Sequence, residues 1–246
     1  MTGDLRVSIV IPAYNEGTDI LAGLDRIVEA VQLPAEILVV VDSENDTTVP
    51  VIREYSAAHP HFSYLINDYG RGPAQAIRYG IDHANADTVV VTMSDGCDDP
   101  RQIDDLVKLV ERGVVVAAAS RYMAGGQQVG GPRFKGFLSR TAGKSLHLFT
   151  AAGTRDATNS FKAYKRSFVQ AVGIDSRDGF EIGLELTAKA RRLRLPVAEI
   201  PTIWLDREFG ESNFKLTRWI PKYLKWYRFA FGSRLTIEQL RSKSSR

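Results

Sequence analysis

Carboxylate side chains recur just after short apolar runs in the first hundred residues. Glu16, Asp42 and Asp95 each stand a few residues beyond such a run. Carboxylate oxygens are preferred ligands of Mg²⁺ and Mn²⁺, and Mg²⁺ commonly shares its coordination shell with substrate phosphates. These residue types therefore indicate a site that holds a diphosphate through a divalent cation.

The apolar pattern predicts the scaffold that positions these carboxylates. Residues 7–11 are apolar and β-branched and are closed by Pro12, as is typical of a buried strand. Such runs alternate with stretches of helical periodicity, so we expect an α/β protein with a mostly parallel sheet covered on both faces. The expected strands are 7–11, 36–41, 60–66, 88–92 and 114–119, and the expected helices are 18–31, 47–58, 72–84 and 103–112.

Three polar clusters fall at the carboxyl ends of these strands, where open α/β sheets bind ligands. They are residues 14–16, 42–46 and 94–99. The chain has no G-x-G-x-x-G after its first strand and no G-x-x-x-x-G-K-[ST], which argues against a dinucleotide fingerprint and a P-loop. A metal-bound diphosphate, as in a nucleotide diphosphate sugar, is the remaining chemistry that suits an acidic edge.

The second part of the chain is less regular. Residues 124–135 are rich in glycine and predict a mobile loop. Further helices are expected at 139–151, 179–192 and 218–231, with strands at 158–165 and 197–204. Because Pro201 interrupts the last strand, we expect that strand at an edge of the sheet.

No repeat or linker divides the chain, so we expect a single domain over residues 1–246. Within it we expect a nucleotide-binding half at 1–120, an acceptor half at 121–215, and an amphipathic C-terminal helix and tail at 216–246.

Composition narrows the class of protein. The formal net charge of +3 is too small to argue for nucleic acid, and no apolar run approaches the roughly 20 residues of a membrane-spanning helix. The only cysteine, Cys97, cannot form an internal disulfide, and the start of the chain lacks the features of a signal peptide. We therefore expect a soluble or peripheral protein of the cytoplasm that could act at the inner face of the membrane.

Several motifs resemble one family. VSIVIPAYNE at 7–16, VVDSENDTT at 40–48 and GRGPAQAIRYG at 70–80 are similar to the opening motifs of family 2 glycosyltransferases, which share the GT-A fold. The resemblance implies that fold and a sugar transfer from a nucleotide diphosphate sugar.

Later motifs resemble the polyprenyl-phosphate branch of that family, to which dolichol-phosphate mannosyltransferases belong. They are SRY at 120–122, DATNSFKAYKR at 156–166 and DREFGES at 206–212. The branch implies a lipid phosphate acceptor and inversion at the sugar carbon by direct displacement. An acceptor that is already an anion near pH 7 needs no strong general base, but two anions must be held together by cations.

One departure concerns the metal. The family's D-x-D motif falls on Met93, Ser94 and Asp95, so only the last acid is kept. Asp95 is therefore the best candidate ligand for Mg²⁺ or Mn²⁺, and Asp98 or a water completes the coordination shell.

The resemblance also assigns roles to residues of this sequence. Asp95, Arg121 and Arg207 are the candidate catalytic residues, and the metal ligands are Asp95 and Asp98. The nucleotide-binding residues are Pro12, Tyr14, Glu16, Asp42, Arg71, Ser94 and Asp95. The acceptor and phosphate residues are Arg121, Arg133, Arg140, Arg207, Ser212 and Lys215.

Other interpretations stay open. The turn after the first strand could be a plain helix start capped by Asn15, and Asp99 could serve only the start of the next helix. The acceptor could be a soluble glycan or natural product, or the chain could be a non-catalytic relative. The helix at 218–231 could pack on the domain, or it could place Trp219, Trp226 and Phe229 in a membrane interface.

Overall fold

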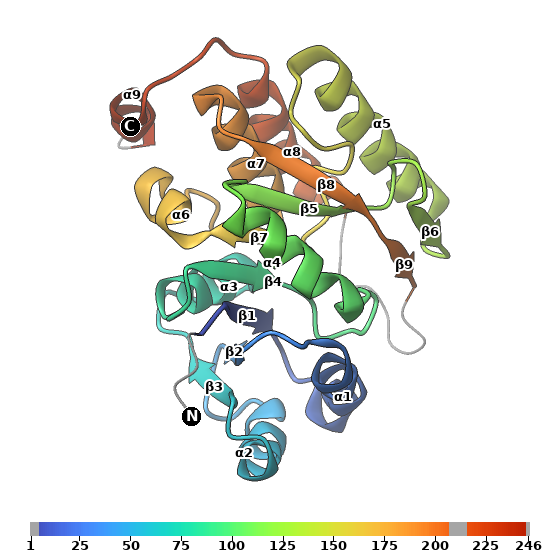
Figure 1. Ribbon diagram of the computed structural model, residues 1–246, viewed down its shortest axis with the longest axis vertical. Coiled ribbons are helices and arrows are strands. Elements are labelled where there is room, and N and C mark those ends of the chain that lie inside the picture. The colour runs from blue at the N-terminus through green and yellow to red at the C-terminus, as the bar shows by residue number, and fades with distance from the viewer. Residues whose placement is uncertain (1–4, 207–215, 245–246) are drawn as a thin grey trace.

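The computed structural model describes residues 5–206 and 216–244 and has a seven-stranded sheet at its centre (Figure 1). The strands are β1 (Val7–Pro12), β2 (Ala35–Val41), β3 (Phe62–Ile66), β4 (Thr88–Val91), β5 (Val116–Ser120), β6 (Gln127–Val129), β7 (Lys162–Lys165), β8 (Val197–Pro201) and β9 (Ile203–Leu205). The order in the large sheet is β3-β2-β1-β4-β7-β5-β8, and β6 pairs with β9.

Within this sheet only β7 runs antiparallel to its neighbours β4 and β5. The mostly parallel α/β sheet expected from the sequence is therefore confirmed. The segment 197–204 forms two strands, β8 and β9, rather than one, and β8 lies at the sheet edge as Pro201 predicts.

The helices are α1 (Ile20–Ala30), α2 (Thr48–Ala58), α3 (Pro73–Asp82), α4 (Ile103–Glu111), α5 (Arg133–Thr150), α6 (Arg166–Val172), α7 (Ile182–Leu193), α8 (Leu216–Ala230) and α9 (Ile237–Ser244). Short 3-10 turns at Gly17–Asp19 and Pro100–Gln102 precede α1 and α4. The expectations for α1 to α4 are correct to within a few residues. Those for the second half miss α6 and α9 and begin α5 six residues too late.

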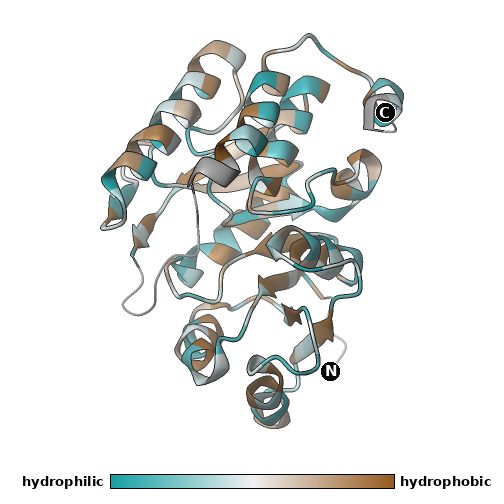
Figure 2. Ribbon diagram, turned by 180° about the vertical axis from the view of Figure 1, so that it is seen from behind, coloured by the Kyte–Doolittle hydropathy of each residue, from teal (hydrophilic) through white to brown (hydrophobic). Residues whose placement is uncertain are grey.

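Side chains of β1 alternate between the two faces of the sheet, and both faces are covered, so the strand is apolar except for the buried Ser8. Val7, Ile9 and Ile11 pack with residues of α1, α2 and α4. Val10 points to the other face, where it packs with residues of α3 and α7. The strands accordingly stand out as hydrophobic in Figure 2. Helices on both faces leave the carboxyl ends of β1, β2 and β4 as a shared edge.

Helix α3 approaches β1 so closely that it needs a glycine. A Cβ atom on Gly80 would overlap Cγ1 of Val10 and lie 3.0 Å from Cγ2 of Val40. We expect Gly80→Ala to lower the free energy of unfolding by about 1–3 kcal/mol, because neither strand can retreat in a packed core. Urea denaturation measures this. The matched control is Gly136→Ala on α5, where the new Cβ meets only the side chain of Gln128. Equal stabilities of the two variants would contradict the packing argument.

Helix α8 packs against the domain through a face that includes two of the aromatic residues expected to contact a membrane. Trp226 is only 4% exposed and donates its Nε1–H to Oγ of Ser176 at 3.0 Å. Phe229 packs beside it, with an edge-to-face ring contact of 5.4 Å between centroids. The assignment of Trp226 and Phe229 to a membrane interface is therefore wrong, because both rings fill the space between α5, α7 and α8. The side chain of Trp219 lies outside the described residues.

Glu185, on α7, is part of this packing. It is fully buried, accepts the backbone N–H groups of Asp175 and Ser176 at 2.6 and 2.9 Å, and pairs with Lys189 at 2.6 Å. All of these partners are structural, so Glu185 holds the loop before α7 in place.

Candidate active site

The turn after β1 is tied to the loop after β2. The backbone N–H of Asn15 donates to Oδ2 of Asp46 at 2.9 Å, and that of Glu16 donates to Oγ1 of Thr48 at 3.1 Å. Asn15 is left-handed, with φ of 53°, and its side chain accepts from the N–H of Thr47 at 3.3 Å instead of capping the turn after it. The interpretation of Asn15 as a helix cap is therefore wrong. Asp46, buried beneath the turn, is a positioning residue.

Tyr14 projects from this turn. Its side chain is 67% exposed, which leaves the ring open to a ligand at the carboxyl end of β1. An exposed aromatic ring beside a strand edge is suited to stacking on a nucleotide base.

Asp42, at the end of β2, organises the loop that leads into α3. Its Oδ1 accepts from Nδ2 of Asn67 at 2.9 Å, and its Oδ2 accepts from the backbone N–H of Gly72 at 2.9 Å. Gly72 has φ of 108°, a conformation that favours glycine, and Pro73 then opens the helix. The loop between Asn67 and Gly72 carries Arg71, whose side chain is exposed. Asn67 is a site residue that the sequence interpretation missed.

The loop after β4 meets the turn after β1, as the shared edge predicts. Oγ of Ser94 donates to Oε1 of Glu16 at 3.0 Å. Arg26 of α1 holds the far side of the same loop by donating to the carbonyls of Gly96 and Asp98 at 2.6 and 3.2 Å. The loop that carries Asp95 is therefore fixed from two directions.

Asp98 is a buried carboxyl close enough to Asp95 for their charges to interact. Burial, and then the negative charge of Asp95, raise the pKa of Asp98 to about 7. Its Oδ2 accepts from Oγ1 of Thr92 at 2.9 Å and from the N–H of Met93 at 3.4 Å. Asp99, by contrast, accepts from the N–H of Arg101 and pairs with its guanidinium at 2.7 Å, so it serves the start of the turn before α4.

The donor set at this edge suits a divalent cation that also binds substrate. Within residues 5–206 and 216–244 no three His, Cys, Asp or Glu side chains gather closely enough to hold a metal by themselves. The carboxyl groups of Asp95 and Asp98 lie in the loop after β4, close enough for their negative charges to repel each other. One or two carboxylates, completed by substrate phosphates and waters, is the usual protein contribution to Mg²⁺.

Arg121 lies at the carboxyl end of β5 and is locked by Asp156. Its Nε donates to Oδ2 at 2.7 Å, its Nη2 donates to Oδ1 at 2.9 Å, and its backbone N–H donates to Oδ2 at 3.0 Å. Burial acts to raise the pKa of Asp156, but the charge and hydrogen bonds of Arg121 outweigh it and lower that pKa. The charge of Arg121 also acts to lower the pKa of Asp98, so the arginine lies within electrostatic reach of that carboxyl group.

A second guanidinium joins this group through Tyr122. Arg121 lies 4.9 Å and Arg140 5.3 Å from the centroid of the Tyr122 ring. Arg121 is mostly buried and Arg140, on α5, is exposed. The pair therefore offers one fixed and one accessible cation at the same place.

Lys162 is a further cation that the sequence interpretation missed. It is fully buried on β7, and its Nζ donates to the carbonyls of Asp156 and Ala157 at 3.2 and 3.3 Å and to that of Asn159. Burial lowers its pKa to about 7, against the opposing charge of Asp156. Its place in the motif DATNSFKAYKR was the available signal.

The structure brings together only part of the expected set. Ser94 contacts Glu16, and the charges of Asp95 and Arg121 act on the neighbouring Asp98. Asp42 supports the loop that leads into α3. Three further expected residues have exposed side chains: Tyr14 and Arg71 in the loops after β1 and β3, and Arg133 at the start of α5. Three others, Arg207, Ser212 and Lys215, lie outside the described residues.

Residues 8–173, two thirds of the chain, match the family model for glycosyl transferase family 2. The chain belongs to this family. The sequence motifs implied a glycosyltransferase with the GT-A fold, and both expectations are confirmed.

This glycosyltransferase is similar over most of its length to two curated relatives. It is 27% identical over 230 residues to a polyprenol monophosphomannose synthase of Mycolicibacterium smegmatis, covering 87% of the chain and 86% of the relative. It is 29% identical over 232 residues to a dolichol-phosphate mannosyltransferase of Pyrococcus furiosus, covering 90% of the chain but only 64% of that longer relative.

Solved structures confirm the fold. Glucosyl-3-phosphoglycerate synthase from Mycobacterium tuberculosis, in complex with Mn²⁺, uridine diphosphate and glucosyl-3-phosphoglycerate, superposes with a TM-score of 0.66 at 16% identity, covering 94% of this chain and 81% of that one. A mannosyltransferase from Pyrobaculum calidifontis, in complex with GDP-Man and Mn²⁺, gives 0.62 at 20% identity, covering 99% and 70%.

Proposed function

We propose that this glycosyltransferase moves a sugar, with inversion, from a nucleotide diphosphate sugar to a polyprenyl phosphate, using Mg²⁺ or Mn²⁺. The observation that carries the proposal is Arg121, locked by Asp156 and within electrostatic reach of Asp98, whose own charge interacts with that of Asp95. A fixed cation beside a metal-binding edge is what two neighbouring phosphate groups require. The names of the relatives support the acceptor class.

The nucleotide end of the site is proposed at the carboxyl ends of β1 and β2. The exposed ring of Tyr14 offers a stacking surface for the base, and Pro12 and Glu16 border it. Asp42 positions the loop that carries Arg71, whose exposed guanidinium suits a phosphate or ribose contact.

The transfer step needs little acid–base chemistry from the protein. An oxygen of the acceptor phosphate is already an anion; it attacks the anomeric carbon while the bond from that carbon to the diphosphate breaks. The bonding electrons and negative charge leave with the nucleoside diphosphate. Asp95 and Asp98 would hold the divalent cation, which would supply positive charge to stabilise the leaving diphosphate.

The cations of the chain handle the acceptor. Arg121 is held by Asp156 in one orientation and provides preorganised positive charge, which loses no free energy to reorganisation during the reaction. Arg140 and Arg133, at exposed positions on α5, are available to bind the acceptor phosphate.

A soluble phosphorylated acceptor is the second candidate. The observation in its favour is the structural likeness to the Mycobacterium tuberculosis synthase, whose complex contains glucosyl-3-phosphoglycerate. One purified sample incubated with labelled nucleotide sugars and either a polyprenyl phosphate or 3-phosphoglycerate separates the two. Label in the organic phase alone supports the lipid acceptor, and label in the aqueous product alone overturns it.

We also propose peripheral contact with the membrane, at the inner face, through the outer surface of α5 and α8. Phe134 and Phe137 on α5 are 64% and 63% exposed, beside the exposed cations Arg133 and Arg140. Further exposed apolar side chains are Leu148 and Phe149 on α5, Ile220 and Leu224 on α8, and Phe231 just after α8. Aromatic and cationic side chains together suit a lipid interface. Among the described residues no helix is both long and apolar enough to span a membrane.

The phenylalanines should carry much of this contact. We expect Phe134→Ser with Phe137→Ser to weaken binding to vesicles by at least about tenfold, because each buried phenylalanine contributes about 1.5–3 kcal/mol. Vesicle co-sedimentation measures this. Ile237→Ser, which removes an exposed apolar side chain on α9, is the control and should bind like the unmodified protein. Equal binding by the double variant would remove α5 from the interface.

A further inference from the structure

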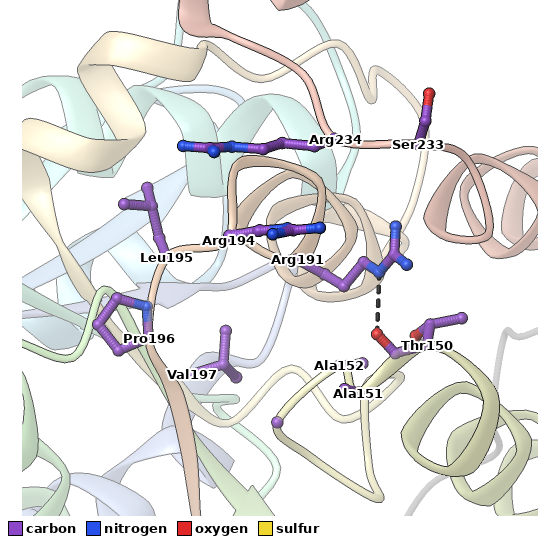
Figure 3. Close-up of a pocket in the computed structure, with 11 residues that line it drawn as sticks. Thr150, Ala151, Ala152, Arg191, Arg194, Leu195, Pro196, Val197, Ser233 and Arg234 are labelled. Carbon is purple, nitrogen blue, oxygen red and sulfur yellow. Dashed lines mark hydrogen bonds between the residues drawn. The ribbon is translucent and has the colours of Figure 1, made fainter.

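A cavity of about 620 Å³ lies away from the catalytic edge (Figure 3). It is bounded by the end of α5, the end of α7 with the start of β8, and the segment after α8. Val197, which lines it, begins β8, whereas Pro201 at the other end of that strand pairs with Ser120 just before Arg121. The length of β8 therefore separates the cavity from the catalytic edge.

Three arginines line this cavity: Arg191, Arg194 and Arg234. The eleven lining residues include no aspartate or glutamate. In the described part of the chain none of the three arginines forms an ion pair. The cavity thus concentrates positive charge without an internal counter-charge.

A structural role accounts for some of this charge. Arg191 donates its Nε–H to the carbonyl of Thr150 at 2.9 Å and also donates to Gly232, so it ties the end of α5 to the segment after α8. The neighbouring Arg192 donates to the carbonyls of Phe229 and Ser233. Cations at the C-terminal ends of helices also interact favourably with the helix dipole.

That role does not extend to Arg194 and Arg234. Both side chains are exposed, and neither guanidinium has a hydrogen bond or ion pair within the described residues. Figure 3 shows them extended beside Arg191 around the same space. Within the described residues, the positive charge of these two guanidinium groups is therefore not neutralised by a partner.

We propose that this cavity binds a phosphate-bearing ligand at a site separate from the catalytic edge. Guanidinium groups match phosphate oxygens with paired hydrogen bonds, and Ser233 also lines the cavity. The same chemistry fits two sources, a soluble phosphorylated compound or the headgroup phosphate of an anionic lipid.

The test compares the protein with R194Q/R234Q, which removes both unpartnered charges from exposed positions. The first arm follows the rise in melting temperature on adding inorganic phosphate, and the second follows binding to phosphatidylcholine vesicles with and without phosphatidylglycerol. R112Q removes one exposed arginine at the end of α4 and serves as the control. R194K/R234K keeps the charges and should behave largely like the unmodified protein.

We expect R194Q/R234Q to lose at least about half of the phosphate-dependent rise or to bind anionic vesicles at least about tenfold more weakly, while R112Q changes neither. A loss in the phosphate arm alone assigns a soluble ligand, and a loss in the vesicle arm alone assigns a lipid headgroup. If R194Q/R234Q matches the unmodified protein in both arms, the site does not exist. Phosphate bound at the catalytic edge contributes equally to all variants and does not affect the comparison.

Discussion

Replacing Asp95 by asparagine should lower kcat/KM for sugar transfer by about 100-fold or more, with little change in melting temperature. The substitution removes the negative charge expected to hold the cation that stabilises the leaving diphosphate, a class of interaction worth several kcal/mol in the transition state. Asparagine keeps an oxygen that can accept the N–H of Cys97, which Asp95 accepts at 3.2 Å, so the loop should retain its shape. Steady-state kinetics over a series of Mn²⁺ concentrations measures the effect.

The matched control is Asp99→Asn in the same loop. Asp99 is paired with Arg101 and starts the turn before α4, so its charge is used structurally. We expect kcat/KM and its dependence on Mn²⁺ to stay close to those of the unmodified protein. If Asp95→Asn were as active as Asp99→Asn, Asp95 would not be a metal ligand.

Replacing Asp156 by alanine should lower the free energy of unfolding by about 3–5 kcal/mol and abolish transfer. Asp156 is fully buried and accepts three hydrogen bonds from Arg121, so its loss leaves a buried guanidinium without its counter-charge. The same change removes the nearest opposing charge from Lys162, which is also buried. Urea denaturation followed by circular dichroism measures the midpoint and slope.

Asp105→Ala is the matched control for this second prediction. Asp105 pairs with Lys108 at 2.9 Å on the exposed face of α4, with 64% and 52% of the two side chains exposed. Solvent-exposed pairs contribute at most about 1 kcal/mol. A loss of stability at Asp156→Ala no larger than that at Asp105→Ala would show that Arg121 finds other partners and is not fixed by Asp156.

The first half of the site could be predicted from the sequence because local patterns determine it. Apolar runs of β-branched residues predict buried parallel strands, and the carboxyl ends of neighbouring parallel strands meet at one edge. The hydrogen bond between Ser94 and Glu16, 78 residues apart, confirms that geometry. The roles of the residues in binding remain predictions.

The second half depends on long-range packing that a sequence pattern does not reveal. Strand β7 enters the sheet antiparallel between β4 and β5, and this insertion brings Asp156 to Arg121 across 35 residues. Periodicity on α8 could not decide which aromatic side chains face inward, because both faces of the helix carry them. Trp226 points inward since Ser176 and Lys189 offer its ring a polar partner and a cation.

The most direct measurement follows labelled sugar into polyprenyl phosphate from a panel of nucleotide diphosphate sugars, using the unmodified protein and Asp95→Asn with Mn²⁺ or with EDTA. The proposed function predicts a lipid-phosphate product of inverted anomeric configuration, formed by the unmodified protein with Mn²⁺ and nearly absent with EDTA or in Asp95→Asn. Equal product formation in EDTA, or no transfer to the lipid phosphate from any nucleotide sugar of the panel, would contradict it.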